Sequence, residues 1–461
     1  MNGQAIETPD ARTYFSRGLA LHKAGRHEEA EALCKQALER FPRHADLWNL
    51  RGVNFRVAKQ YARAAACLRE GLALAPRDPS LWSNLGNVLK DLKHCETAAV
   101  CHRRSLELQP DSVSTLHNLG IALSEGGRDS EALEVYERAL AIEPGNADVR
   151  WDRALSRLRT GNYAGGWTDY EARIERGDPP KRDMPGKRWN GERYDGKRLL
   201  IVSEQGLGDT IWVARYFPMA KKFGGELIVE CRPEVAALIE SMGMADRIVF
   251  KRDPLPDADY HILQCSLPSV FAHQGAPVPT APYLAAPAGH GERIAAVMKP
   301  GKGRLKVGIV WGGSVTYGRR ADRDAPLAMF LQWFALPGVQ LYSLQKGPQE
   351  EDLNSLPAGA PIVNLTPHTK DFFETAAAVA QLDLVLMTDT AVAHLAGALG
   401  RPVWVLLNRV PHWLWQLDGG DCFWYPSMRL FRQRAWGDWG GAFDQAAAAL
   451  LELGNARRGR A

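Results

Sequence analysis

The segment 389–400 places three polar side chains in a setting that suits anion binding. Its polar residues are Asp389, Thr390 and His394, and small or aliphatic residues make up the rest. The apolar run 382–388 before it predicts a buried strand, so the polar turn should open a helix at the carboxyl edge of a parallel sheet. The first free N–H groups of such a helix attract anions. A capped core helix with a hydrogen-bonded histidine is the alternative.

A second polar turn follows the strand expected at 198–203. It contains Gln205, Gly206, Gly208 and Asp209, and an amphipathic helix comes next. The third glycine of a dinucleotide-binding fingerprint is missing, which disfavours a dinucleotide-dependent oxidoreductase. The turn predicts a ligand site, and an aspartate that only caps the helix is the alternative.

A basic loop follows a further strand, expected at 305–311. Two glycines and Ser314 come directly after this strand, and Arg319, Arg320 and Arg323 follow within a few residues. Guanidinium groups bind phosphates through paired hydrogen bonds, so the cluster suits a diphosphate. A solvated surface loop is the alternative.

Composition limits the class of protein. A length of 461 residues predicts about three domains, and 45% hydrophobic with 24% charged residues is ordinary for a folded chain. The net charge of +4 gives no reason to expect nucleic acid as a partner. The seven cysteines lack Cys-x-x-Cys spacing and predict neither disulfides nor a zinc site. Without a signal sequence or an apolar run of about 18 residues, we expect a cytoplasmic protein with no transmembrane segment.

The first third of the chain repeats with a period of 34 residues. Four positions carry the period: Gly18, Gly52, Gly86, Gly120; Pro42, Pro76, Pro110, Pro144; Ala30, Ala64, Ala98, Ala132; and Tyr14, Trp48, Trp82, Leu116. Over about residues 11–146 this spacing resembles the tetratricopeptide repeat, with two helices in each unit. Small residues allow the helices to approach closely, and each proline ends the second helix.

A fifth unit begins near Ala147 and departs from the pattern, because Ala154 replaces the glycine. It resembles a capping pair, and we expect Trp167, Tyr170 and Arg173 to dock the array on the next domain. The array itself predicts a groove for a peptide or protein partner. A rigid spacer or a surface for a homodimer is the alternative.

The rest of the chain alternates strand-like and helix-like segments, which predicts α/β domains with parallel sheets. The expected boundaries are 11–175 for the repeats with the capping pair, 176–197 for a linker rich in Pro, Gly and charge, 198–290 for a first Rossmann-like domain, and 303–454 for a second. Two such domains would face each other across a cleft.

Residues 198–440 resemble the GT-B glycosyltransferases of the heptosyltransferase-like group, glycosyltransferase family 9, in the form joined to tetratricopeptide repeats in bacteria. The motifs that carry the resemblance are 204–210, 307–313, 343–345, Asp371-Phe372 with Thr375-Ala376, and 389–397. In architecture alone the chain is also similar to protein O-linked sugar transferases.

The resemblance implies inverting transfer of a sugar from a nucleotide donor to a protein or glycan acceptor presented by the repeats. It implies no required metal and no cofactor beyond the nucleotide-sugar substrate. Asp209 matches the family's general base on the acceptor side, in a loop with Gln205, Gly206 and Gly208.

On the donor side, the resemblance implies that Thr390 and the amide of Ala391 hold the diphosphate. His394 would support its charge as a cation or a hydrogen-bond donor, and Asp389 would contact the sugar. Four further residues are candidates for donor binding: Ser314, Arg323, Gln345 and Lys346.

One loop departs from the family pattern. The family typically carries an aspartate before Trp-Arg-Trp, whereas this chain has His412 and Leu414 in that loop. This departure puts a role of that loop in doubt. Separately, the alternative function is a GT-B scaffold with weak or no catalysis, whose repeats serve protein interaction.

Overall fold

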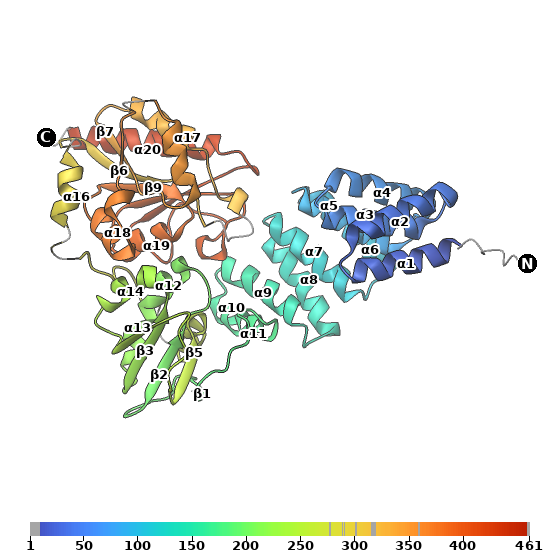
Figure 1. The fold of residues 1–461 in the computed structure, drawn as a ribbon, viewed down its shortest axis with the longest axis horizontal. Helices are drawn as coiled ribbons and strands as arrows, with labels where there is room; N and C mark the ends of the chain where they lie inside the picture. Colours follow the sequence, from blue (N-terminus) through green and yellow to red (C-terminus); the bar gives the residue numbers. More distant parts are fainter. Residues whose placement is uncertain are drawn as a thin grey trace, which may run out of the picture. The chain divides into compact units, whose positions relative to one another are not determined.

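The computed structural model divides into two compact units, Met1–Thr160 and Gly161–Ala461 (Figure 1). It describes residues 10–275, 278–287, 289, 291–299, 302–314, 320–357 and 360–458. Within this part of the chain, no helix is both long and apolar enough to cross a membrane.

The first unit is built of helix pairs. Its helices are α1 (Ala11–Lys23), α2 (His27–Arg40), α3 (Ala45–Val57), α4 (Tyr61–Leu74), α5 (Pro79–Asp91), α6 (Cys95–Leu108), α7 (Val113–Glu125), α8 (Asp129–Ile142) and α9 (Ala147–Arg159). Successive odd-numbered helices begin 34 residues apart, and each helix packs against the next along the chain. The helical repeat predicted from the sequence period is confirmed.

The repeated glycines mark the closest approach of the two helices in a pair. A Cβ atom at Gly52 would lie 2.7 Å from Leu68 Cγ, and one at Gly120 would lie 2.2 Å from Tyr136 Cε1. In each case the obstructing side chain comes sixteen residues later. Glycine is needed because the second helix already fills this space.

The aromatic and proline positions of the repeat are coupled. The indole N–H of Trp48 donates to the carbonyl of Pro42 at 2.8 Å, and that of Trp82 donates to the carbonyl of Pro76 at 2.9 Å. Each tryptophan therefore ties the start of its own helix pair to the turn that ends the preceding pair.

The second unit contains two sheets in which every strand pair is parallel. The first has the order β1-β5-β2-β3-β4 and the second β11-β10-β9-β6-β7-β8. The strands are β1 (Lys187–Arg188), β2 (Arg198–Val202), β3 (Glu226–Cys231), β4 (Arg247–Phe250), β5 (Tyr260–Leu263), β6 (Leu305–Val310), β7 (Val339–Ser343), β8 (Ile362–Asn364), β9 (Leu384–Thr388), β10 (Val403–Leu407) and β11 (Met428–Arg432). The second order is that of a Rossmann fold. The predicted α/β class is confirmed.

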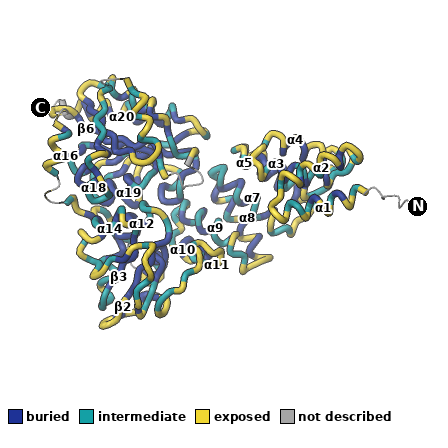
Figure 2. The backbone as a smooth tube through the Cα atoms, in the orientation of Figure 1, coloured by how far each residue is buried: buried dark blue, intermediate teal, exposed yellow. Residues whose placement is uncertain are grey.

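Helices cover both sheets, and the central strands are mostly buried, whereas the edge strands β1, β4 and β8 are mostly half-buried or exposed (Figure 2). The helices of this unit are α10 (Tyr163–Tyr170), α11 (Ala172–Glu175), α12 (Leu207–Val213), α13 (Phe217–Lys221), α14 (Pro233–Glu240), α15 (Leu267–His273), α16 (Gly291–Val297), α17 (Leu327–Leu331), α18 (Phe372–Val379), α19 (Ala391–Ala398) and α20 (Gly440–Arg458). The two sheet domains meet through their helices, because α12 packs on α19 and α14 packs on α18.

The segment 176–197, expected to be a linker, is partly built into the first sheet domain. It contributes strand β1, and Trp189 and Tyr194 are buried. Arg182 also pairs with Glu230 at 2.9 Å. Proline, glycine and charge suggested a linker, whereas the two buried aromatic side chains anchor this segment in the sheet domain. The helices α10 and α11, expected with the repeats, lie in the second compact unit.

The Gly120→Ala substitution should destabilise the repeat array. Its new methyl group meets the ring of Tyr136, and such overpacking costs about 1–3 kcal/mol, more than the roughly 0.5–1 kcal/mol that alanine gains over glycine inside a helix. Gly145→Ala is the control, because no atom lies within 4 Å of its Cβ position. Thermal loss of the helical circular dichroism signal measures both variants, and equal midpoints would contradict the packing argument.

Candidate active site

The order in which strands are added to the second sheet reverses between β6 and β9, and their two turns meet there. A Cβ atom at Gly313, after β6, would lie 3.7 Å from Thr390 Cγ2, after β9. Arg323 reaches the same place, with its Nε 3.3 Å from Asp389 Oδ2. Such a switch point is where open α/β sheets bind ligands. The structure thus brings together Asp389, Thr390 and Arg323, while Ser314 is exposed beside Gly313.

Thr390 begins helix α19 with a hydroxyl that does not serve the helix. Its backbone is extended, with φ −141° and ψ 173°, and its side chain makes no capping hydrogen bond. The buried Oγ1 atoms of Thr390 and Thr388 have no hydrogen-bond partner within the described residues. A buried hydroxyl without a partner is costly, so a ligand that bonds to it is favoured. The first amide of the helix, that of Ala391, lies beside Thr390.

Gln345 braces the turn after β6. Its Oε1 accepts from the backbone N–H groups of Trp311 and Gly312 at 2.9 and 2.8 Å. Its Nε2 donates to the carbonyls of Gly312 and Lys346 at 3.1 and 2.8 Å. Since these four bonds use all the amide's capacity, the direct donor contact predicted for Gln345 is replaced by a positioning role. Lys346 is exposed and donates to the carbonyl of Thr369. The predicted Arg319 lies outside the described residues.

In the turn after β2, Asp209 lies in the first turn of helix α12. The N–H of Gly206, which caps α12, donates to Asp209 Oδ2 at 3.0 Å. Asp209 is therefore the third residue of the helix and not its cap. In the same turn, Gln205 donates to the hydroxyl of Tyr170 at 3.0 Å. This arrangement fixes the carboxylate and leaves part of Asp209 accessible.

Gly208 allows the two predicted turns to touch. A Cβ atom there would lie 2.9 Å from His394 Cδ2 and 3.3 Å from Ala391 Cα. Helix α12 thus rests directly on the first turn of α19, with Asp209 next in sequence to the contact. The structure brings the acceptor-side and donor-side candidates into one place.

The surroundings of Asp209 raise the pKa of its carboxyl to about 6. Burial is the largest cause, and the nearby charge of Glu204 adds to it. The hydrogen bond from Gly206 and the positive charge of Arg323 act in the opposite direction. A carboxyl with a pKa near neutrality is poised to exchange protons.

His394 is neutral at physiological pH. Burial, followed by the positive charges of Arg215 and Arg323, lowers its pKa to about 3. Its Nδ1 lies 3.0 Å from the hydroxyl of Tyr425, and its ring stacks on Trp415 at 5.1 Å between centroids. The predicted role as a cation is contradicted by this burial, and the role as a hydrogen-bond donor stays a prediction.

Arg215 is a member of the site that the sequence patterns missed. Its guanidinium is buried and donates to the carbonyls of Trp212 and Trp424 at 2.9 and 3.2 Å. The rings of Tyr283 and Tyr425 lie 4.9 and 4.8 Å away. Within the described part of the chain no carboxylate pairs with it, and its guanidinium is held by carbonyls, the hydroxyl of Tyr283 and aromatic faces. A single charge in the apolar run 211–217 was the available signal.

Comparisons with known families agree with both parts of this chain. Residues 11–44 and 78–143 match models described as tetratricopeptide repeat, and residues 337–409 match glycosyltransferase family 9 (heptosyltransferase). The chain carries tetratricopeptide repeats and a glycosyltransferase family 9 domain. The match to family 9 includes the Asp389–His394 turn and does not reach Asp209.

Individual proteins that resemble this chain have low sequence identity to it. Protein FlbA of Caulobacter vibrioides is 29% identical over 334 residues, which cover 67% of this chain and 55% of FlbA. The chain thus spans about half the length of this curated relative. Among solved structures, YrrB is 23% identical and covers 36% of this chain and 86% of its own, with a TM-score of 0.31. Pseudomonas aeruginosa pilF is also 23% identical, covering 36% and 75%, with a TM-score of 0.34.

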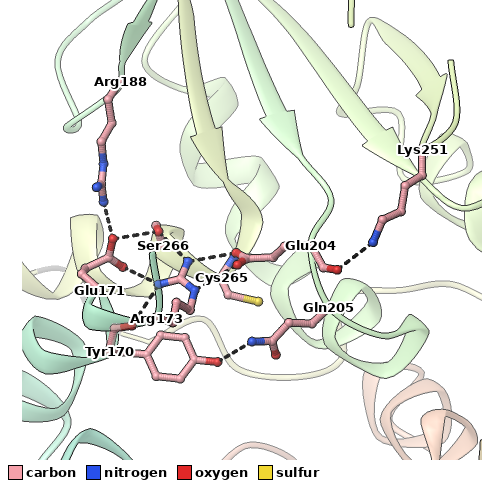
Figure 3. Close-up of polar contacts among 9 residues, drawn as sticks. All are labelled: Tyr170, Glu171, Arg173, Arg188, Glu204, Gln205, Lys251, Cys265 and Ser266. Carbon is pink, nitrogen blue, oxygen red and sulfur yellow. Dashed lines mark hydrogen bonds and ion pairs between the residues drawn. The ribbon is translucent and has the colours of Figure 1, made fainter. Parts of the chain in front are cut away.

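An ion-pair network anchors the turn of the first sheet domain in the second unit (Figure 3). Arg173 donates to both carboxylate oxygens of Glu204, each at 2.9 Å, and to Ser266 Oγ at 2.8 Å. The backbone N–H of Cys265 donates to Glu204 Oε1 at 2.8 Å. Lys251 bonds to the carbonyl of Glu204 at 2.7 Å. The residue directly before Gln205 is therefore held from several sides.

Aromatic side chains join helix α10 to both sheet domains. The ring of Trp167 lies 6.0 Å from that of Trp212 and 5.3 Å from that of Trp413. Tyr170 lies 6.3 Å from Trp413. Trp167, Tyr170 and Arg173, which we expected to dock on the next domain, all pack within the second unit.

Asp209→Asn should stabilise the fold above about pH 6 and lose this effect in acid. The carboxyl has a pKa of about 6 in the folded state against 3.8 as an ordinary aspartate. The folded protein therefore binds the proton more tightly than the unfolded chain does, so the cost of holding the ionised form develops as the pH rises from 3.8 and is fully present above about 6. Asparagine keeps the acceptor for the N–H of Gly206 and removes this cost.

Thermal midpoints measured at about pH 4 and pH 8 test this expectation. Asp195→Asn is the control, because the hydrogen bond from Arg193 lowers the pKa of this exposed carboxyl, and the sign of its small effect is opposite. An equal gain for Asp209→Asn at both pH values would contradict the argument.

Proposed function

We propose that the protein is an inverting, metal-independent glycosyltransferase of GT-B architecture. It moves a sugar from a nucleotide donor to a hydroxyl or amine of a protein or glycan acceptor. The observation that carries the proposal is the contact of Gly208 with His394, which joins an aspartate of raised pKa to the helix start of a family 9 domain.

Asp209 acts as the general base. Its pKa of about 6 makes it ionised and still basic near neutral pH. The bond from Gly206 N–H to Oδ2 orients the carboxylate, and its partial exposure lets an acceptor approach. The acceptor oxygen or nitrogen gives its proton to Asp209 and attacks the sugar from the side opposite the departing diphosphate, which inverts the anomeric centre.

The start of α19 binds the donor diphosphate. The hydroxyl of Thr390 and the amide of Ala391 supply hydrogen bonds, and the helix dipole favours the anion. Arg323, 3.3 Å from Asp389, lies within reach of the same place. A carboxylate already occupies this guanidinium, so the diphosphate shares or replaces Asp389 as its partner, which frees Asp389 to contact the sugar.

His394 donates a hydrogen bond to the leaving group. Its Nδ1 bonds with the hydroxyl of Tyr425, and its Nε2 lies 3.5 Å from the Cβ position of Gly208, so this nitrogen faces α12. When Tyr425 donates to Nδ1, the imidazole proton sits on Nε2. A neutral donor of this kind stabilises developing negative charge without a proton transfer from solvent.

Buried positive charges stabilise the diphosphate leaving group, which is the role of a metal ion in other transferases. Arg215 is buried without a carboxylate partner in the described part of the chain, and Arg323 acts on the same site. In a dry environment these charges and the helix dipole stabilise a nucleoside diphosphate leaving group.

The repeats supply the partner specificity. We propose that they present the protein or glycan acceptor and that they can also pair two copies of the chain. Six buried cysteines carry free thiols, which fits a reducing compartment such as the cytoplasm; they are Cys34, Cys67, Cys101, Cys231, Cys265 and Cys422.

Asp209→Asn and His394→Ala should each lower transfer or donor hydrolysis by at least roughly tenfold, because one removes the base and the other a charge stabiliser. In the wild type, kcat/KM should fall as the pH drops through about 6, where Asp209 takes up a proton. A panel of nucleotide sugars assayed with the full chain measures both effects. Unchanged turnover in both variants would sink the assignment. Ligand binding without turnover by the wild type would favour the scaffold function.

Thr390→Val and Arg323→Gln should reduce the rise in thermal midpoint that the matching nucleoside diphosphate gives. Valine preserves shape while removing the hydroxyl, and glutamine removes the charge. A ligand that binds only the folded state raises its midpoint, so a panel of nucleoside diphosphates identifies the base and measures the loss. Arg193→Gln is the control, because this exposed arginine pairs with Asp195 away from the site. Equal shifts in all variants would remove Thr390 and Arg323 from the donor site.

A further inference from the structure

We propose that His22, His27 and Asn54, in the first repeats, form a binding site for one divalent transition-metal ion of the zinc type. The three residues come from three successive helices, α1, α2 and α3. The site lies entirely within the first compact unit and is independent of the transferase chemistry.

The distances among the three donor atoms carry the proposal. His22 Nδ1 lies 2.9 Å from Asn54 Oδ1 and 3.2 Å from His27 Nδ1, and His27 Nδ1 lies 3.3 Å from Asn54 Oδ1. A tetrahedral zinc ion with bonds of about 2.0–2.1 Å holds its ligand atoms about 3.3 Å apart. The triangle of donor atoms therefore matches one face of such a coordination shell.

Hydrogen bonding accounts poorly for this triangle. A neutral imidazole carries one proton, so a pair of Nδ1 atoms in contact needs one protonated and one bare nitrogen. The bare nitrogen then faces the lone pairs of Asn54 Oδ1, and two protonated nitrogens would instead repel each other. A cation among the three atoms satisfies all three lone pairs at once.

The third ligand is already oriented. Asn54 is buried, and its Nδ2 donates to the carbonyl of Leu50 at 2.9 Å, which turns Oδ1 toward the histidines. His22 and His27 are half-buried, so the ion has access from solvent and a water molecule can complete the tetrahedron. Imidazole nitrogen with one amide oxygen suits Zn²⁺, Co²⁺, Ni²⁺ or Cu²⁺ better than Mg²⁺ or Ca²⁺.

Metal binding here would link the first helix pair, α1 and α2, to the second pair through α3. Ligands from three helices tie α1 and α2 to α3 directly. The ion's binding free energy then adds to the stability of these folded helices.

Isothermal titration of the chelator-stripped full chain with Zn²⁺ tests the site. The wild type should bind one ion, and His22→Ala and His27→Ala should each weaken binding by about tenfold or more, as loss of a ligand requires. His94→Ala is the matched control, because this histidine is exposed at the start of α6 and should leave binding unchanged. No Zn²⁺ binding by the wild type, or equal binding by the His27→Ala variant, would overturn the proposal.

Two further measurements separate this site from adventitious binding. Co²⁺ should give the visible absorption of a tetrahedral nitrogen and oxygen site, and sulfur-to-cobalt bands would assign the ion to cysteines instead. Asn54→Asp supplies a carboxylate in place of the amide and should tighten Zn²⁺ binding, even though it gives up the bond to Leu50. Weaker or equal affinity in this variant would overturn Asn54 as the third ligand.

Discussion

The close approach of α12 to α19 at Gly208 and His394 is the constraint on which the candidate site depends. Any side chain at position 208 would enter the space of the imidazole, because its Cβ would lie only 2.9 Å from Cδ2. The two sheets alone would place two ligand turns on separate domains. The glycine contact turns them into one site, since it sets Asp209 beside the helix start that carries Thr390.

The charges around this contact explain why its two titratable groups shift in opposite directions. Burial favours the neutral form of each, so it raises the pKa of Asp209 and lowers that of His394. Arg323 is positive toward both groups, which opposes the shift of the acid and reinforces that of the base. The result is a proton acceptor near neutrality and an imidazole without charge, the pair that the proposed transfer uses.

The features that repeat in the sequence were the most predictable. A 34-residue period carried by glycine, alanine, tryptophan and proline is enough to locate each helix pair, because every one of these residues has a local packing reason. The strands were also predictable, since their apolar runs end at polar turns. The contact between Gly208 and the start of α19 was not predictable, because it depends on how two domains pack.

Within the site, too, some residue roles could be predicted from the sequence and others depend on contacts between distant segments. Residue types indicated which turns could bind a ligand. The sequence does not distinguish a glutamine that binds a ligand from one that stabilises a loop, and only the four hydrogen bonds of Gln345 show that it does the latter. Arg215 was missed because its partners are carbonyls and rings from distant segments. Composition likewise suggested a free linker at 176–197, and the buried Trp189 overrides it.

The ion pair of Arg173 with Glu204 connects helix α11 to the turn that carries Asp209. A buried pair of this kind contributes little net stability, because desolvation of both charges offsets their attraction, while removal of one partner leaves the other charge buried and is strongly destabilising. Its value here is positional and electrostatic. Glu204 raises the pKa of Asp209, and Arg173 from α11 neutralises and orients Glu204. The proton affinity of the proposed base thus depends on a helix that the repeat pattern alone would assign to the array. The compact unit that contains Asp209 accordingly begins before α10, after Thr160, and not at the first strand.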